Sequence, residues 1–394
     1  MESAALNASR PAALNVQARA TPASRLLYID NIRIYLTILV ILHHLAVIYT
    51  GSGGWIYYDG RQDDITSALG GWFTAVNQAY FMGLFLFISA YFVPGAYDRK
   101  GPAKFLVDRL IRLGIPLAFY CWVLRPLLIY TGMRPGGSLW EWYTRTYFRD
   151  YGIIGGGPLW FIEILLIFSA VYVLARLLVR TASSISGSQA HFPSNRSIFL
   201  FAVLLGIASF LVRTVSPVNN TFAPLNLQFA NFAQYIALFI AGLVAYRRNW
   251  LSALPDAAGK LWLGIAVLLI LIYAPLGLLA GGSENKELFL GGWHWQSLVF
   301  ALWEAFLCVG MSIGLVSLFR RSLNRQGRLA QELSRSAYTA YLIHEPIITF
   351  LAVFAAGVLI YPLFKMVLAT VVAVPLCFAL SSLIRRLPYM QRIL

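Results

Sequence analysis

The sequence is poor in charged residues and in cysteine. Only 12% of its 394 residues are Asp, Glu, Lys or Arg, roughly half the share typical of soluble domains. The three cysteines, Cys121, Cys308 and Cys377, are far apart in apolar segments, so a disulfide framework and a cysteine metal cluster are both excluded. The patterns H-E-x-x-H, G-x-x-x-x-G-K-[ST] and G-x-S-x-G do not occur. Zinc-protease, nucleotide-hydrolase and esterase-elbow chemistry therefore have no sequence support.

Long apolar runs dominate the sequence instead. Apolar residues make up 59% of the chain and aromatic residues 15%. A helix needs roughly 20 apolar residues to cross a bilayer core, so the sequence predicts an all-α, multi-pass membrane protein with ten spanning helices. The aromatic residues are expected in belts at the membrane interfaces. The spans are expected near residues 32–50, 71–93, 110–130, 158–180, 197–214, 230–246, 261–280, 294–319, 336–357 and 359–383.

The basic residues are unevenly distributed between the predicted loops. Lys and Arg number 31 against 16 Asp and Glu, which gives a net charge of +15. Most of the basic residues fall on the side that carries the N-terminus, and basic loops are typical of the cytoplasmic face. We therefore expect both termini in the cytoplasm, the lipid bilayer as a partner, and no nucleic acid. In a bacterium the protein would lie in the inner membrane.

A simple domain organisation is expected. Residues 1–25, rich in Ala, Ser and Arg, contain no apolar run, and we expect a disordered tail that superficially resembles a transit peptide. Residues 26–386 are expected to form one ten-helix membrane domain, followed by a short C-terminal tail over 387–394. No loop is long enough for a separate soluble domain.

Ionisable residues inside the predicted spans are candidates for function, because each costs at least a few kcal/mol at membrane depth. Arg33 and His44 lie eleven residues apart in the first span, about 16 Å along the helix and on nearly the same face. Arg33 alone could be an interfacial anchor paired with Asp30, and His44 alone could hydrogen-bond between helices. Together they suit a ligand with an anionic head and a reactive tail, with His44 as the general base. The neighbouring His43 points away, so no metal site is expected.

Other candidates come from later spans. Arg109 and Arg112, one helical turn apart, could bind phosphate or merely attract anionic lipid. His344 could be a structural partner or a second catalytic group. Glu163, just after a Gly-Pro turn, could stabilise a helix N-terminus or meet a hydroxyl substrate. Glu304 could face the same cavity or be a neutral carboxylic acid hydrogen-bonded between helices.

Five motifs occur in order along the chain: Arg-x10-His in the first span, FMGLFLFISAYF (81–92), DRLIRLGIP (108–116), PLWFIEILL (158–166) and YTAYLIHEP (338–346). Together they resemble the acyltransferase 3 family of integral membrane O-acyltransferases, and within it the glucan-biosynthesis branch. The resemblance implies transfer of an acyl group, acetyl or succinyl, from cytoplasmic acyl-coenzyme A to a carbohydrate hydroxyl such as that of a periplasmic glucan. No permanently bound cofactor is implied.

The resemblance also assigns residues. The Arg-x10-His pair of the family corresponds to Arg33 and His44, with His44 carrying catalysis, and its Arg-x-x-Arg motif corresponds to Arg109 and Arg112. We expect these three arginines to hold the coenzyme A phosphates. Glu163 and His344 are the further catalytic candidates.

Two other functions fit the same residues. A polar cavity with titratable His and Glu also describes a proton-coupled transporter or exporter of a small polar or anionic substrate. An unrelated membrane O-acyltransferase fold could use a buried histidine on lipid or protein, since a fold does not define a substrate. Acyl transfer by the purified protein, compared with substrate flux without acylation, distinguishes an enzyme from a transporter.

Overall fold

A computed structural model describes residues 25–59, 63–133, 136–153, 155–179, 191–222, 225, 227–279 and 285–394. The secondary structure in these ranges is entirely helical, apart from one isolated β-bridge. Ten helical stretches in the described part of the chain are long and apolar enough to cross a membrane. The predicted all-α architecture with ten spans is therefore confirmed, and the protein is an integral multi-pass membrane protein. Of the predicted N-terminal tail, only Arg25 lies within the described residues.

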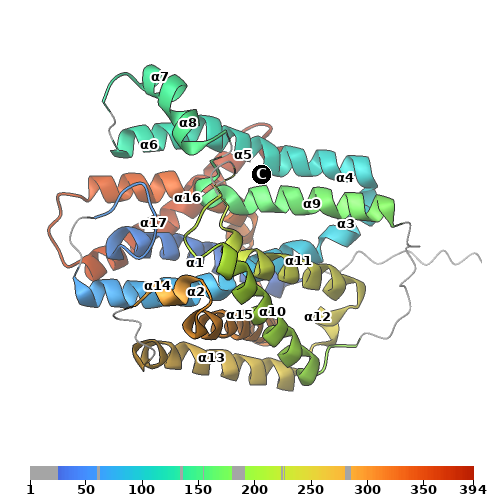
Figure 1. The fold of residues 1–394 in the computed structure, drawn as a ribbon. Coiled ribbons are helices and arrows are strands. Elements are labelled where there is room, and N and C mark those ends of the chain that lie inside the picture. Colours follow the sequence, from blue (N-terminus) through green and yellow to red (C-terminus); the bar gives the residue numbers. More distant parts are fainter. Residues whose placement is uncertain are drawn as a thin grey trace, which may run out of the picture.

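The helices run across the molecule side by side (Figure 1). The first part of the chain forms α1 (Leu27–Thr50), α2 (Asp64–Tyr91), α3 (Val93–Lys100), α4 (Pro102–Arg109), α5 (Ile115–Phe119), α6 (Arg125–Met133), α7 (Leu139–Trp142), α8 (Phe148–Tyr151) and α9 (Trp160–Leu178). The remainder forms α10 (Asn195–Val215), α11 (Phe232–Arg247), α12 (Trp250–Ala253), α13 (Asp256–Leu279), α14 (Glu287–Leu290), α15 (Trp295–Ser322), α16 (Arg328–Phe354), α17 (Pro362–Arg385) and α18 (Met390–Ile393). Three π-helical segments, η1 (Leu110–Gly114), η2 (Tyr120–Leu124) and η3 (Tyr143–Tyr147), and two 3-10 turns, η4 (Gly157–Leu159) and η5 (Phe229–Asn231), complete the set.

Several helices begin earlier than their apolar runs predict. The first helix starts at Leu27 rather than near residue 32, and the second at Asp64 rather than near residue 71. Asp63 caps the second helix, because Thr66 donates to its carboxylate from the hydroxyl (2.6 Å) and the backbone N–H (2.9 Å). These hydrogen bonds lower the pKa of Asp63. Hydropathy marks only the membrane core, whereas backbone hydrogen bonding continues to the cap.

The third span, Pro102–Met133, is a continuous helix in which η1 and η2 interrupt the α-helical hydrogen bonding. Proline has no N–H, so Pro116 and Pro126 leave the carbonyls four residues before them without their usual donor. Tyrosine hydroxyls from other segments donate to these carbonyls, at 2.5 Å to the Arg112 oxygen and 3.0 Å to the Trp122 oxygen. Such π-helical insertions are frequent at functional sites.

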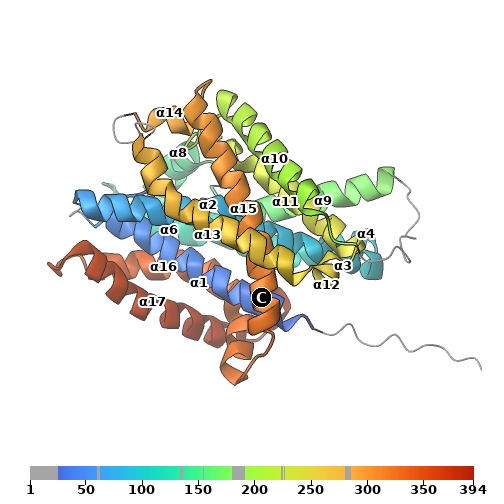
Figure 2. The same ribbon diagram turned by 90° about the horizontal axis from the view of Figure 1, so that it is seen from below.

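The first helix lies in the interior of the bundle. Helices α2, α15, α16 and α17 pack against α1, and α13 and α10 pack on the outer side of α15 (Figure 1). Helices α4, α5, α6 and α9 run along the opposite edge. The beginning of α1 and the C-terminal end of the chain lie at the same end of the bundle (Figure 2). Because α1 is surrounded, most of its side chains are buried against other helices.

Candidate active site

Two histidines from the first and ninth spans form a hydrogen-bonded pair. Nε2 of His344, in α16, lies 3.0 Å from Nδ1 of His44, in α1. The two rings stack with their centroids 5.0 Å apart and 22° between their planes. His344 is completely buried, and its Nδ1 lies 2.6 Å from the backbone oxygen of Tyr341, one turn earlier in α16. We call His44 and His344 the histidine pair.

The hydrogen bonds determine which ring nitrogens carry protons when both histidines are neutral. A carbonyl oxygen can only accept, so Nδ1–H of His344 donates to Tyr341. Nε2 of His344 must then accept, and His44 donates to it from Nδ1. The free lone pair of His44 is therefore on Nε2. This is the arrangement of a general base whose orientation is set by a third group.

A loop after α1 folds back over the histidine pair. The ring of Trp55 lies 4.6 Å from the ring of His44, and its Nε1 donates to the hydroxyl of Thr349 at 3.2 Å. Asp59, at the end of the same loop, forms an ion pair with the buried Lys365 of α17. The loop therefore covers His44 and is fixed to two other spans.

A second polar group lies beside the histidine pair, at the turn that precedes α9. We call this segment, Gly155–Pro158, the glycine turn. The hydroxyl of Tyr341 donates to the backbone oxygen of Pro158, while the backbone oxygen of the same tyrosine accepts from His344. Gly157 has a φ of +44°, a left-handed conformation that favours glycine. One tyrosine thus ties the glycine turn to the histidine pair.

Two residues of the third span contribute to this region and were not among the sequence candidates. The hydroxyl of Tyr120 donates to the carboxylate of Glu345, the residue after His344. Arg125 donates to the backbone oxygen of Gly155, and its guanidinium lies over the ring of Tyr151 at 5.7 Å. Arg125 could have been identified as a candidate from the sequence, because it is a charged residue inside a predicted span. No sequence pattern singled out Tyr120.

Glu163 lies in the first turn of α9 and borders the glycine turn. Its side chain is buried, with 4% exposure, and neither carboxylate oxygen has a hydrogen-bond partner among the described residues. A Cβ atom placed on Gly156 would come within 3.2 Å of Oε2 of Glu163. The carboxylate is therefore directed toward the turn, in the same region as the histidine pair.

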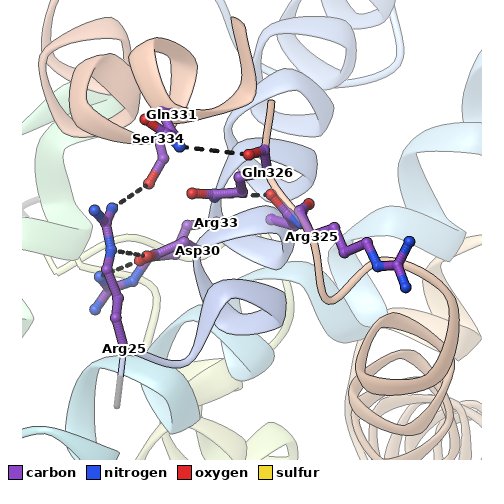
Figure 3. A network of polar contacts seen from close by, with 8 residues as sticks. Arg25, Asp30, Arg33, Arg325, Gln326, Gln331 and Ser334 are labelled. Carbon is purple, nitrogen blue, oxygen red and sulfur yellow. Dashed lines mark hydrogen bonds and ion pairs between the residues drawn. The ribbon is translucent and has the colours of Figure 1, made fainter. Parts of the chain in front are cut away.

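Arg33 lies near the other end of α1, in a network of polar contacts (Figure 3). Asp30 accepts a hydrogen bond from Arg25 at 2.6 Å and lies 3.7 Å from Arg33. The Arg33 guanidinium also lies over the ring of Phe92, at 4.9 Å. Its contact with Asp30 is an ion pair longer than a hydrogen bond, and its side chain is 39% exposed. Pairing with Asp30 therefore leaves the Arg33 N–H groups free to bind an anion.

Arg109 of the third span lies near Arg33, and Arg112 lies one helical turn after Arg109. The charge of Arg109 interacts with those of Arg33 and Arg112, and its guanidinium lies 5.1 Å from the ring of Phe105. Tyr338 of α16 donates to the backbone oxygen of Arg112 at 2.5 Å, which attaches this part of the third span to the ninth. We call Arg33, Arg109 and Arg112 the arginine cluster.

The candidate site thus has two parts, connected by α1. The arginine cluster lies at the end of the bundle where α1 begins, and the histidine pair lies deeper, with eleven residues of helix, about 16 Å, between Arg33 and His44. The cluster can bind a polyanion, and the pair can accept a proton. In the described residues no group of three or more His, Cys, Asp and Glu side chains could hold a metal ion.

Glu304 belongs to neither part. It forms an ion pair with Arg213 of α10, whose side chain is 2% exposed. Arg213 also donates to the backbone oxygen of Ala230 at 3.3 Å and to the side chain of Asn231 at 3.2 Å. Glu304 therefore pairs with a cation on another helix, where the sequence suggested a neutral acid hydrogen-bonded between helices. A cavity shared with Glu163 stays a prediction. Arg213 lies inside the bundle, with 1% exposure.

Comparison with known proteins agrees with this architecture. The family model described as an acyltransferase domain matches residues 26–384. The chain is 23% identical over 344 residues to glucans biosynthesis protein C of Salmonella schwarzengrund (strain CVM19633), a match that covers 84% of each chain. No solved structure matches the chain. Because the family match includes all ten spans, the arginine cluster and the histidine pair, the chain belongs to the acyltransferase 3 family and is a membrane acyltransferase.

Proposed function

We propose that the protein transfers an acetyl or succinyl group from acyl-coenzyme A to a hydroxyl of a carbohydrate, such as a periplasmic glucan or another cell-envelope glycan. The observation that carries the proposal is the hydrogen bond between His44 Nδ1 and His344 Nε2. It leaves Nε2 of His44 as a positioned proton acceptor. The choice of a glucan rests on the name of the Salmonella relative.

The arginine cluster would bind the acyl donor. Coenzyme A carries several phosphates, and arginine forks bind phosphate with two parallel hydrogen bonds. The excess of Lys and Arg in the loops at this end favours its placement in the cytoplasm, where acyl-coenzyme A is made. The pantetheine arm would then run along α1 from Arg33 toward His44, and the acceptor would enter from the opposite side of the membrane.

The chemistry at the histidine pair is a direct acyl transfer. Nε2 of His44 removes the proton of the acceptor hydroxyl as its oxygen attacks the thioester carbonyl carbon. A new C–O bond forms and the C–S bond breaks. The proton passes from His44 to the departing sulfur, so the products are an ester and the free coenzyme A thiol. Holding both substrates at one base also contributes through orientation.

The purified protein in lipid nanodiscs tests this function. It is mixed with acetyl- or succinyl-coenzyme A and a glucose oligosaccharide, and products are measured by mass spectrometry. We expect the oligosaccharide mass to increase by one acyl unit, with an equal amount of free coenzyme A. Transport of the oligosaccharide by reconstituted vesicles without any acylated product would contradict the proposal and support a transporter.

Changes to the third-span arginines should weaken donor binding specifically. In Arg109→Ala and Arg112→Ala, loss of a charged hydrogen bond to phosphate should raise the KM for acyl-coenzyme A by about tenfold, with kcat little changed. Steady-state kinetics with varied donor concentration measures this. Arg145→Ala is the control, because Arg145 is exposed and paired with Glu141. An unchanged donor KM would assign Arg109 and Arg112 to lipid anchoring.

The role proposed for His344 can be separated from simple packing. His344→Leu removes the acceptor for His44 Nδ1–H and should lower kcat by about 10²-fold through misorientation of the base. His344→Gln retains an oxygen that can accept this hydrogen bond, so it should lose less activity. The KM for acyl-coenzyme A should be unchanged in both variants. Equal losses in His344→Leu and His344→Gln would indicate that His344 only fills space.

A further inference from the structure

Unpaired polar atoms face the glycine turn from two spans. Nε of Arg125 and both carboxylate oxygens of Glu163 are buried and have no hydrogen-bond partner among the described residues. Burying such groups without partners is unfavourable, and more so when they are charged. The mechanism at the histidine pair uses neither residue. Their unsatisfied hydrogen-bonding capacity therefore points to a ligand group that binds here.

Gly156 and Gly157 have no Cβ, which lets the polar atoms of Glu163 and Arg125 lie close to the backbone of the turn. A Cβ atom on Gly156 would lie 3.2 Å from Oε2 of Glu163, and one on Gly157 would lie 3.2 Å from Nε of Arg125. The two polar atoms therefore border consecutive residues of one turn. Neither Arg125 nor Glu163 forms an ion pair within 4.0 Å in the described part of the chain.

Each of the two groups is held in position. Arg125 donates through Nη1 to the backbone oxygen of Gly155, and its guanidinium lies over the ring of Tyr151. These contacts fix the guanidinium and leave its Nε–H without a hydrogen-bond acceptor among the described residues. Glu163 lies in the first turn of α9, directly after the glycine turn. An N–H donor and a carboxylate acceptor that border consecutive residues of one turn match a hydroxyl group, which can accept one hydrogen bond and donate another.

We propose that Arg125 and Glu163 bind a hydroxyl of the sugar acceptor at the glycine turn, accepting from Arg125 Nε–H and donating to Glu163. The inference rests on the proposed acyl transfer to a carbohydrate. The backbone oxygen of Tyr341 accepts from His344, and the hydroxyl of the same residue donates to Pro158 in the glycine turn. The glycine turn and the histidine pair are therefore about one tyrosine side chain apart. The bound hydroxyl is therefore a second one of the same sugar, and the two residues determine which hydroxyl reaches His44.

Binding and kinetics with a glucose oligosaccharide test this assignment. Glu163→Gln and Arg125→Lys each weaken one of the two hydrogen bonds, and we expect the Kd and the acceptor KM to increase about tenfold. Gly156→Ala, at a backbone φ of −63° that alanine accepts, adds a methyl group 3.2 Å from Oε2 of Glu163 and 3.1 Å from the backbone nitrogen of Trp160. The carboxylate or the start of α9 must then shift, and acceptor binding should weaken to a similar extent. The KM for acyl-coenzyme A should not change in any of the three.

The controls separate failure of this site from failure of the proposed function. Gly264→Ala adds the same methyl group where no atom lies within 4 Å, so acceptor binding should match wild type. Binding is also measured in His44→Ala, where it should persist without transfer. Wild-type transfer with unchanged acceptor Kd and KM in all three site variants would overturn the inference, because Arg125 and Glu163 would then not contact the acceptor. Absence of transfer and of oligosaccharide binding in wild type would overturn the proposed function as well.

Discussion

His44→Ala is expected to reduce acyl transfer by about 10²–10⁴-fold, the range that a positioned general base contributes. Alanine removes the only ring nitrogen that the hydrogen bonds of the histidine pair leave as a free acceptor, Nε2 of His44. The attacking hydroxyl would then have to lose its proton without help. Because the arginine cluster is unchanged, the KM for acyl-coenzyme A should stay close to that of wild type. Initial rates of ester formation by purified protein measure both quantities.

The adjacent histidine provides a matched control. His43 is also buried, and its ring packs against Phe81 with the centroids 5.0 Å apart and against the His44 ring at 5.4 Å. Its Nδ1 has no hydrogen-bond partner in the described residues, so it does not orient His44 by a hydrogen bond from that atom. His43→Ala should therefore retain most of the kcat at equal membrane levels. Full activity of His44→Ala would exclude a base at this position, and equal losses in His43→Ala and His44→Ala would indicate a common effect on folding.

Glu304→Leu is expected to lower the free energy of unfolding by about 3–5 kcal/mol, the range seen when one partner of a buried ion pair is removed. The variant leaves Arg213 charged and 2% exposed. Its remaining contacts, hydrogen bonds to Ala230 and Asn231 and the ring of Phe300 at 5.6 Å, do not neutralise the charge. Unfolding in mixed micelles, followed by tryptophan fluorescence, gives the free energy.

Two further variants show whether the unpaired charge of Arg213 causes the loss of stability in Glu304→Leu. The double variant Arg213→Leu/Glu304→Leu removes both charges and should recover most of the lost stability, because apolar pairs often replace buried ion pairs without loss. Glu141→Leu breaks an exposed ion pair of the same residue types, with Arg145, and should have a small effect. A double variant as unstable as Glu304→Leu would show that packing, rather than the unpaired charge, is responsible.

The pairing of Arg213 with Glu304 cannot be inferred from the sequence alone. Both Arg213 and Glu304 were visible as charges in or near spans, but their partnership depends on the rotation of α10 against α15. The same limit applies to the third span. Arg125 was detectable as a charge within a span, whereas Tyr120 was not, because a tyrosine in an apolar run is unremarkable until Glu345 is found opposite its hydroxyl.

The sequence by itself determined the number and order of the spans, and the position of Arg33 and His44 on one face of α1. Hydropathy and helical periodicity are local properties, so they can be read without knowing any neighbour. Only the tertiary structure decided that His344 orients His44, from 300 residues away. It also decided that Arg125 and Glu163 border the same turn. Those contacts depend on how separate helices rotate and pack against one another, which no local pattern contains.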